Sequence, residues 1–216
     1  MIDFIWVAVA LPLLGAATLL LFGKRFGEPG AGYFATGLAF ISFIIGAIAA
    51  VDFFAGDAHG EVVFLFSWIP GLGVDAEFLW DPLSALMTMV VAGVGSLIHL
   101  YSIGYMHGDE RYPRFFAYLN LFLASMLILV LGSNFAVLFV GWELVGLSSY
   151  LLISFWFEKP SAAAAGKKAF VVNRIGDFGF IIALMLIFAA FGSLGFEQVF
   201  EHAEEVLVQG GTTVTV

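Results

Sequence analysis

The chain contains 216 residues, of which 62% are hydrophobic and 12% are charged, and its formal net charge is −9. Soluble globular domains carry about 25% charged residues, so this chain has too little polar surface for a soluble enzyme or a disordered segment. The absence of cysteine excludes disulfides, thiolate metal sites and catalytic thiols, and the acidic balance argues against a nucleic-acid partner. The class that remains is an integral membrane protein that crosses the lipid bilayer several times.

Stretches that lack Asp, Glu, Lys and Arg predict where the chain crosses the membrane, because a spanning helix needs about 20 mainly apolar residues. The stretch 115–142 is too long for one span, and Gly132, Ser133 and Asn134 divide it with turn chemistry. Either Ser133 or Asn134 would cap the helix that follows. We expect an all-α membrane protein, one domain over 1–216, with six transmembrane helices at about 4–23, 30–52, 82–106, 115–131, 135–157 and 162–191.

Two further segments do not read as spans. In the long loop 55–81, the runs Val62–Ile69 and Val74–Trp80 are aromatic and β-branched, and the turn Pro70–Gly73 separates them, which predicts a small extracytoplasmic β-hairpin. Asp81 and Pro82 would then cap and begin the next helix. The acidic stretch around Glu197–Glu205 and the Thr/Val tail begin no seventh span.

The positive charges predict the orientation in the membrane. Seven of the eight basic residues fall in alternate loops, namely Lys24, Arg25, Arg111, Arg114, Lys159, Lys167 and Lys168. The loops of the other side carry acids instead. Because cytoplasmic loops are rich in Lys and Arg, we expect a multi-pass protein, in a bacterial inner membrane, whose two termini are both extracytoplasmic.

Three charged residues fall within predicted spans. An ionised side chain at mid-bilayer costs at least about 2.5–3.5 kcal/mol, so such residues usually face the protein interior and mark ion or proton paths. Glu143 lies near the middle of its span and is the first candidate for a proton site, with a structural carboxylate paired to a basic residue as the alternative. Arg174 and Asp177 are three residues apart on one helix face, where a self-neutralising pair and a functional charge pair are equally good readings.

Two weaker candidates for a proton relay are His99 and Lys168. A histidine can exchange protons near neutral pH, although a lone helical His is as often a hydrogen-bonded packing residue. Lys168 reads more simply as a cytoplasmic anchor. His99 and His107 are too far apart for one helical metal site, and no phosphate loop, nucleophile elbow or haem-ligand pattern appears. We therefore expect no catalytic residue, metal or cofactor in this chain.

Four motifs resemble the antiporter-like subunits of respiratory complex I, the proton-pumping NADH:quinone oxidoreductase. The resemblance is strongest to the subunit L branch, which is related to the large subunit of multi-subunit sodium/proton antiporters. It covers essentially the whole chain, with the motifs in family order: 99–106 (HLYSIGYM), 114–122 (RFFAYLNLF), 141–152 (GWELVGLSSYLL) and 169–179 (AFVVNRIGDFG).

This resemblance implies that Glu143 is the key carboxylate of a first half-channel, working with a lysine on a later, discontinuous helix, and that Arg174 and Asp177 occupy matching family positions. The chain would be the N-terminal part of a proton-translocating subunit, since it ends before that broken helix. Other membrane subunits of complex I and the lipid bilayer would be its partners. The flavin, iron–sulfur clusters and quinone would be held by other subunits.

Two alternatives stay open at this point. A subunit of a sodium/proton antiporter without an attached dehydrogenase would carry the same motifs. A non-transporting scaffold or assembly fragment would be compatible with a chain that holds only the first part of the family's helices.

Overall fold

The computed structural model describes residues 2–56 and 60–209, and the chain is mainly helical with one small sheet. A short 3-10 helix, Ile2–Phe4, precedes α1 (Ile5–Ala55). The hairpin strands are β1 (Glu61–Ile69) and β2 (Val74–Trp80), and the later helices are α2 (Pro82–Tyr105), α3 (Tyr112–Leu131), α4 (Phe135–Ile153), α5 (Pro160–Phe191) and α6 (Phe196–Gln209). Within the described residues, five helices are long and apolar enough to cross a membrane.

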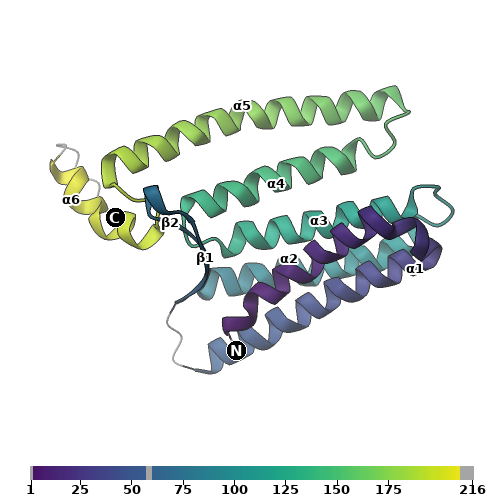
Figure 1. The fold of residues 1–216 in the computed structure, drawn as a ribbon, viewed down its shortest axis with the longest axis horizontal. Helices are drawn as coiled ribbons and strands as arrows, with labels where there is room; N and C mark the ends of the chain where they lie inside the picture. Colours follow the sequence, from purple (N-terminus) through teal and green to yellow (C-terminus); the bar gives the residue numbers. More distant parts are fainter. Residues whose placement is uncertain (1, 57–59, 210–216) are drawn as a thin grey trace.

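Helix α1 is folded back on itself at Gly27 and Glu28. These two residues have non-helical backbone angles, and Gly27 has a φ of 60°, which residues other than glycine rarely adopt. Pro29 follows and has no N–H to donate to the preceding turn. As Figure 1 shows, the two arms of α1 then run side by side in opposite directions. Ser42 of the second arm donates a 2.5 Å hydrogen bond to the carbonyl of Ala8 in the first.

The interior lies between α1, α2 and α3, while α5 is the outermost helix of the bundle (Figure 1). Helix α1 packs against both α2 and α3, α3 packs against α4, and α4 packs against α5. The buried residues of α5 are Gly166 and Asp177 alone, although all of α5 is described. Asp177 is therefore a buried acid on a helix that is otherwise largely exposed.

The predicted hairpin is confirmed. Strands β1 and β2 pair antiparallel, with Glu61 opposite Trp80 and Ile69 opposite Val74, and a 3-10 turn over Pro70–Leu72 joins them. Asp81 caps α2, since its side chain accepts a 2.7 Å bond from the Ser84 N–H.

Asn134 is the residue that caps α4, and it also anchors the hairpin. Its side-chain oxygen accepts a 2.9 Å bond from the Val137 N–H, and its amide nitrogen donates a 2.9 Å bond to the Asp75 carbonyl of β2. Ser133 instead donates to the Glu77 carboxylate at 3.3 Å. The break between α3 and α4 therefore falls where the turn residues predicted it.

Several boundaries differ from the predicted ranges. Helix α3 begins at Tyr112 rather than near 115, because Pro113 is in its first turn and Arg114 does not interrupt a helix that extends beyond the lipid. Helix α4 ends at Ile153 rather than near 157, where the Phe155 N–H turns back to the Leu152 carbonyl at 3.2 Å. The acidic stretch forms α6. The tail from residue 210 onward lies outside the described residues.

Candidate functional site

The three charged residues predicted within the spans come together between α4 and α5. Arg174 Nη1 lies 2.5 Å from Glu143 Oε2 and 3.6 Å from Asp177 Oδ2. Since α4 runs from Phe135 to Ile153, its midpoint falls at Leu144, next to Glu143. One cation and two carboxylates therefore form a cluster at the middle of a membrane-length helix.

Trp142 also belongs to this cluster, and nothing in its sequence context predicted this. The indole Nε1–H of Trp142 donates a 2.8 Å hydrogen bond to Asp177 Oδ1, while Asp177 Oδ2 faces Arg174. The Trp142 ring also meets Phe180 edge to face, with centroids 5.9 Å apart. The Trp142 indole thus binds one oxygen of the Asp177 carboxylate and the Arg174 guanidinium lies near the other, which holds Asp177 in place between α4 and α5.

The Arg174 side chain is partly exposed and contacts Phe170. Its guanidinium carbon lies 4.9 Å from the Phe170 ring centroid, one turn earlier on α5. The Arg174 side chain is 48% exposed, against 23% for Glu143 and 4% for Asp177. Of the three charges, the cation is the least enclosed. The bond lengths place it with Glu143 rather than with Asp177, the residue that its helical spacing predicts as partner.

The small residues around Glu143 act on helix packing. A Cβ added to Gly141 would lie 2.5 Å from the Leu129 backbone, so glycine is what lets α3 and α4 approach beside the cluster. Ser148 lies on α4 five residues after Glu143. Its hydroxyl donates to the Leu144 carbonyl of its own helix at 2.7 Å.

The two candidate relay residues lie away from this cluster. His99 is buried on α2 and its Nδ1 bonds the Gly95 carbonyl at 2.7 Å, with its ring facing Phe116 of α3. Lys168 is exposed near the start of α5. The structure therefore joins Glu143, Arg174 and Asp177 and does not bring His99 or Lys168 to them.

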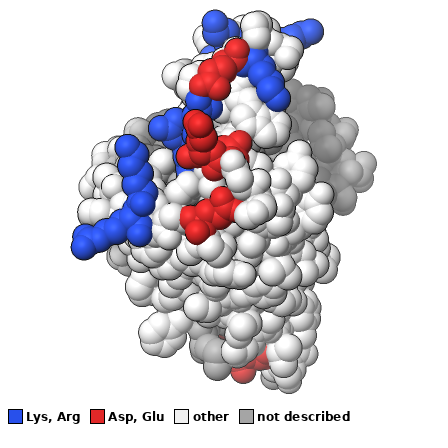
Figure 2. Space-filling view, turned by 90° about the vertical axis from the view of Figure 1, so that its right-hand side faces the viewer, with Lys and Arg blue, Asp and Glu red and all other residues white. Residues whose placement is uncertain are grey.

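The turn of α1 and the turns before α3 and α5 lie at one end of the bundle, and Figure 2 looks onto this end. Glu28 in the break of α1 accepts from the His107 ring and from the Gly108 N–H. Trp156 donates a 2.9 Å bond to Asp109. Arg111 pairs with Glu158. The three turns are thus tied to one another, and the hairpin and α6 lie at the opposite end (Figure 1).

The cluster can redistribute charge. Glu143 and Asp177 compete for Arg174, so a proton added to either carboxyl would move the balance of attraction toward the other. Within the described residues, no three His, Asp or Glu side chains are grouped to hold a metal. The chemistry that this arrangement supports is the movement of a proton or a cation.

Two family models match successive parts of the chain. The N-terminal model of chain 5 of NADH-ubiquinone oxidoreductase (complex I) matches residues 66–116, and the transmembrane model of NADH:quinone oxidoreductase and Mrp antiporters matches residues 132–215.

The sequence similarity to curated relatives extends over nearly the whole chain. NADH-quinone oxidoreductase subunit L of Mycobacterium tuberculosis is 49% identical over 201 residues, which are 91% of this chain and 32% of the relative. The Escherichia coli protein of that name is 39% identical over 206 residues, 94% of this chain and 34% of the relative. The chain thus spans about a third of the length of these relatives.

Solved structures of membrane complexes share the fold. A chain of the Mrp complex from Dietzia is 27% identical, with a TM-score of 0.75, over 90% of this chain and 20% of that one. A chain of the archaeal membrane-bound sulfane sulfur reductase is 22% identical, with a TM-score of 0.82, over 94% of this chain and 41% of that one. At that identity the second likeness concerns the fold alone.

Proposed function

Because the chain belongs to the antiporter-like family of membrane subunits found in NADH:quinone oxidoreductases and Mrp antiporters, we propose that it contributes to proton translocation as part of an NADH:quinone oxidoreductase. The resemblance expected from its motifs is confirmed, and the chain is an integral multi-pass membrane protein. The observation that carries the proposal is the cluster of Glu143, Arg174 and Asp177 between two membrane-length helices.

The proposed mechanism is charge coupling through Arg174. When Glu143 is ionised, the guanidinium stays with it at 2.5 Å. When Glu143 takes up a proton, that attraction is lost and the guanidinium is drawn toward Asp177, which the Trp142 indole keeps in position. Each protonation would thus shift a positive charge along α5 and bias the next site. A lysine outside the described residues, as the family resemblance implies, would respond to that shift.

The proposed setting is a larger complex. Electron transfer would take place in other subunits, which would hold the flavin, the iron–sulfur clusters and the quinone. The relatives are named as parts of such assemblies, and the mostly exposed α5 offers a face for neighbouring helices.

The proposed topology has six spans, with α1 contributing one span from each arm. The seven basic residues lie beside the turn of α1, before or in the first turn of α3, and before or in the first turns of α5, toward one end of the bundle (Figure 2). Placing that end in the cytoplasm puts the hairpin and both termini on the other side, in a bacterial inner membrane.

A sodium/proton antiporter subunit is the second candidate, and the likeness to the Mrp complex favours it. The antiporter reading is second because the chain is 49% identical to an NADH-quinone oxidoreductase subunit and 27% identical to the Mrp chain.

Purification of the tagged chain from its native membrane, followed by identification of its partners, separates the candidates. NADH dehydrogenase subunits in the same complex are the expected result. Antiporter subunits would replace the proposal with the second candidate, and recovery of the chain without either set would indicate a non-transporting scaffold.

A further inference from the structure

The buried face of α2, all of which the structure describes, contains no large apolar side chain. Its buried residues are small or polar and recur at helical spacing: Ser84, Ala85, Thr88, Ala92, Ser96, His99 and Ser102. The Ser96 and Ser102 hydroxyls each donate to a carbonyl one turn earlier at 2.7 Å, which leaves their oxygen lone pairs available as acceptors. A polar seam therefore follows α2 through the interior of the bundle.

Buried polar atoms without a hydrogen-bond partner gather along this seam. Of the six such atoms in the described residues, five belong to α1, α2 and α3, namely Thr36 Oγ1, Thr88 Oγ1, His99 Nε2, Asn120 Nδ2 and Asn120 Oδ1. His99 is 2% exposed and Asn120 is fully buried. The His99 ring and the Asn120 side chain lie close to each other, but no hydrogen bond of normal distance and angle joins them. Folded proteins pair nearly all buried polar atoms with protein or water, so three unpaired atoms on these two side chains point to a ligand.

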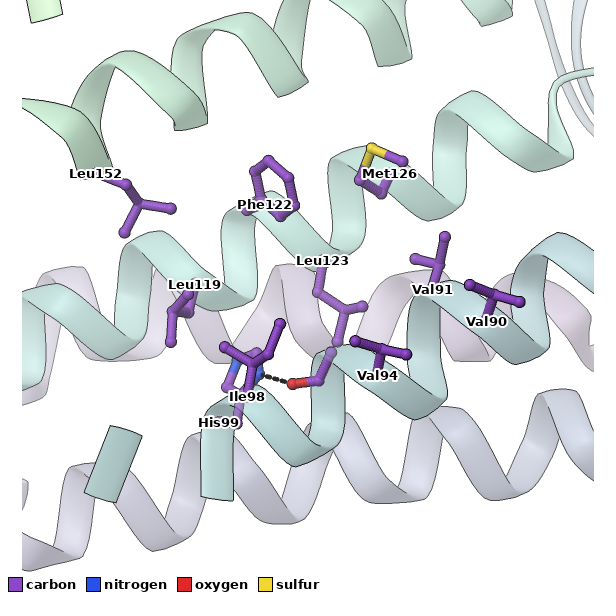
Figure 3. Close-up of a pocket in the computed structure, with 11 residues that line it drawn as sticks. Val90, Val91, Val94, Ile98, His99, Leu119, Phe122, Leu123, Met126 and Leu152 are labelled. Atoms are coloured by element: carbon purple, nitrogen blue, oxygen red, sulfur yellow. Dashed lines mark hydrogen bonds between the residues drawn. The ribbon is translucent and has the colours of Figure 1, made fainter. Parts of the chain in front are cut away.

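The hydrogen bond at the other ring nitrogen sets the chemistry of His99. Its Nδ1 lies 2.7 Å from the Gly95 carbonyl, an acceptor, so Nδ1 carries the proton (Figure 3). In the neutral ring, Nε2 then presents a lone pair. The ring lies 6.4 Å from that of Phe116, centroid to centroid, and Asn120 follows Phe116 by one turn of α3 on the same face.

Helix α1 makes room for the Asn120 amide. A Cβ added to Gly15 would lie 2.4 Å from Asn120 Nδ2, so only glycine at this position leaves space for the amide. On the α4 side of His99, by contrast, lies an apolar cavity of about 300 Å³, lined by side chains such as Leu119, Leu123 and Leu152 (Figure 3). The polar partners of any ligand are therefore on the Asn120 side of the ring.

We propose that His99 and Asn120 form a hydrated site, separate from the Glu143 cluster, at which His99 exchanges a proton with bound water. A buried water makes about three hydrogen bonds. It can donate to His99 Nε2 and to Asn120 Oδ1 and accept from Asn120 Nδ2, which satisfies all three unpaired atoms. When a proton reaches this water, Nε2 takes it and the ring becomes an imidazolium whose Nδ1–H still bonds Gly95. The reverse step returns the proton to water.

Radiolytic hydroxyl-radical labelling of the assembled complex, read by mass spectrometry, tests for the water without measuring activity. Radicals formed from bound water should label His99 despite its burial, well above the fully buried Leu127 after correction for intrinsic reactivity. Asn120→Leu should lower His99 labelling several-fold. Ser125→Ala is the matched control, because Ser125 is also buried on α3 but already bonds the Leu121 carbonyl at 2.6 Å, and it should leave labelling unchanged.

Labelling of His99 at the level of Leu127, or labelling that Asn120→Leu does not change, would overturn the site. If Asn120→Leu does not assemble, Gly15→Ala provides the same comparison, since its methyl group displaces the amide. For the proton step, His99→Gln keeps a hydrogen-bonding side chain that cannot carry a proton. It should slow proton uptake by sealed vesicles several-fold with assembly intact, and an unchanged rate would remove the exchange. The labelling result stands whether or not Glu143 carries protons.

Discussion

The guanidinium of Arg174 on α5 lies 2.5 Å from the carboxylate of Glu143 on α4, closer than it lies to Asp177 on its own helix. The helical spacing of Arg174 and Asp177 alone favours a pair within α5. The close approach of the two helices provides a nearer partner. Two carboxylates consequently share one cation. Loss of the cation should therefore have a different effect from loss of one carboxylate.

Removal of Arg174 should therefore be more harmful than removal of Asp177. Arg174→Leu leaves two carboxylates near each other without a cation, whereas Asp177→Leu leaves Arg174 paired with Glu143. We expect membrane expression to fall several-fold for Arg174→Leu, less for Asp177→Leu, and to recover partly in Arg174→Leu/Glu143→Gln. Immunoblots of membrane fractions measure this order. Equal losses for the two single variants would contradict the shared-cation arrangement.

Trp142 should matter through its N–H group. Trp142→Phe keeps an aromatic ring against Phe180 but deletes the bond to Asp177, a charge-assisted hydrogen bond of a kind worth about 1.5–3 kcal/mol. We expect assembly to persist and the proton-uptake rate of sealed vesicles to fall several-fold. Trp156→Phe is the control, because it deletes an indole bond to Asp109 at the turn before α5. A similar rate for both variants would show that the bond to Asp177 has no special role.

Asn134 should stabilise the junction of the hairpin with α4. Asn134→Ala removes both the helix cap and the bond to the Asp75 carbonyl, so the free energy of unfolding should fall by about 1–2 kcal/mol. Asn134→Asp keeps the helix cap and loses only the amide donor. Its free energy of unfolding should therefore lie between those of the native protein and the Ala variant. Melting temperatures of the purified protein in detergent give the ranking. An Asp variant as unstable as the Ala variant would assign the effect to the hairpin contact alone.

The topology can be tested with single cysteines, because the native chain has none. Gly71 is exposed in the hairpin turn, where an added Cβ meets no atom within 4 Å, and Ser161 is exposed at the start of α5. Gly71→Cys should react with an impermeant maleimide from the outside of intact cells. Ser161→Cys should react only after the membrane is opened. Reaction of both from the same side would exclude the proposed orientation.

The sequence predicted most of the fold because its signals are local. Charge-free stretches mark membrane helices, and Asn134 and Asp81 mark caps, since each depends only on neighbouring residues. The end of α4 at Ile153 was missed, because the turn that follows it is held by contacts with the α2–α3 loop, such as that between Trp156 and Asp109.

The sequence predicted which charged residues form the candidate site, but not which of them pair with each other. Charges within apolar stretches identified Glu143, Arg174 and Asp177. Their partners depend on how α4 and α5 face each other, which spacing along one helix cannot give. Trp142 was missed for the same reason, since an indole beside a glutamate reads as packing until the opposite helix presents a carboxylate.

The central claim is that Glu143 carries a proton, and Glu143→Gln tests it most directly. Glutamine keeps the shape and a hydrogen-bonding oxygen for Arg174 while deleting the titration, so assembly should persist. Glu143→Asp, which is shorter but still titrates, should retain part of the activity. The measurement is NADH-driven proton uptake by sealed inverted vesicles that hold the assembled complex. We predict a strong loss of uptake for the Gln variant, whereas uptake at the native rate would contradict the account and leave Glu143 as a structural partner of Arg174.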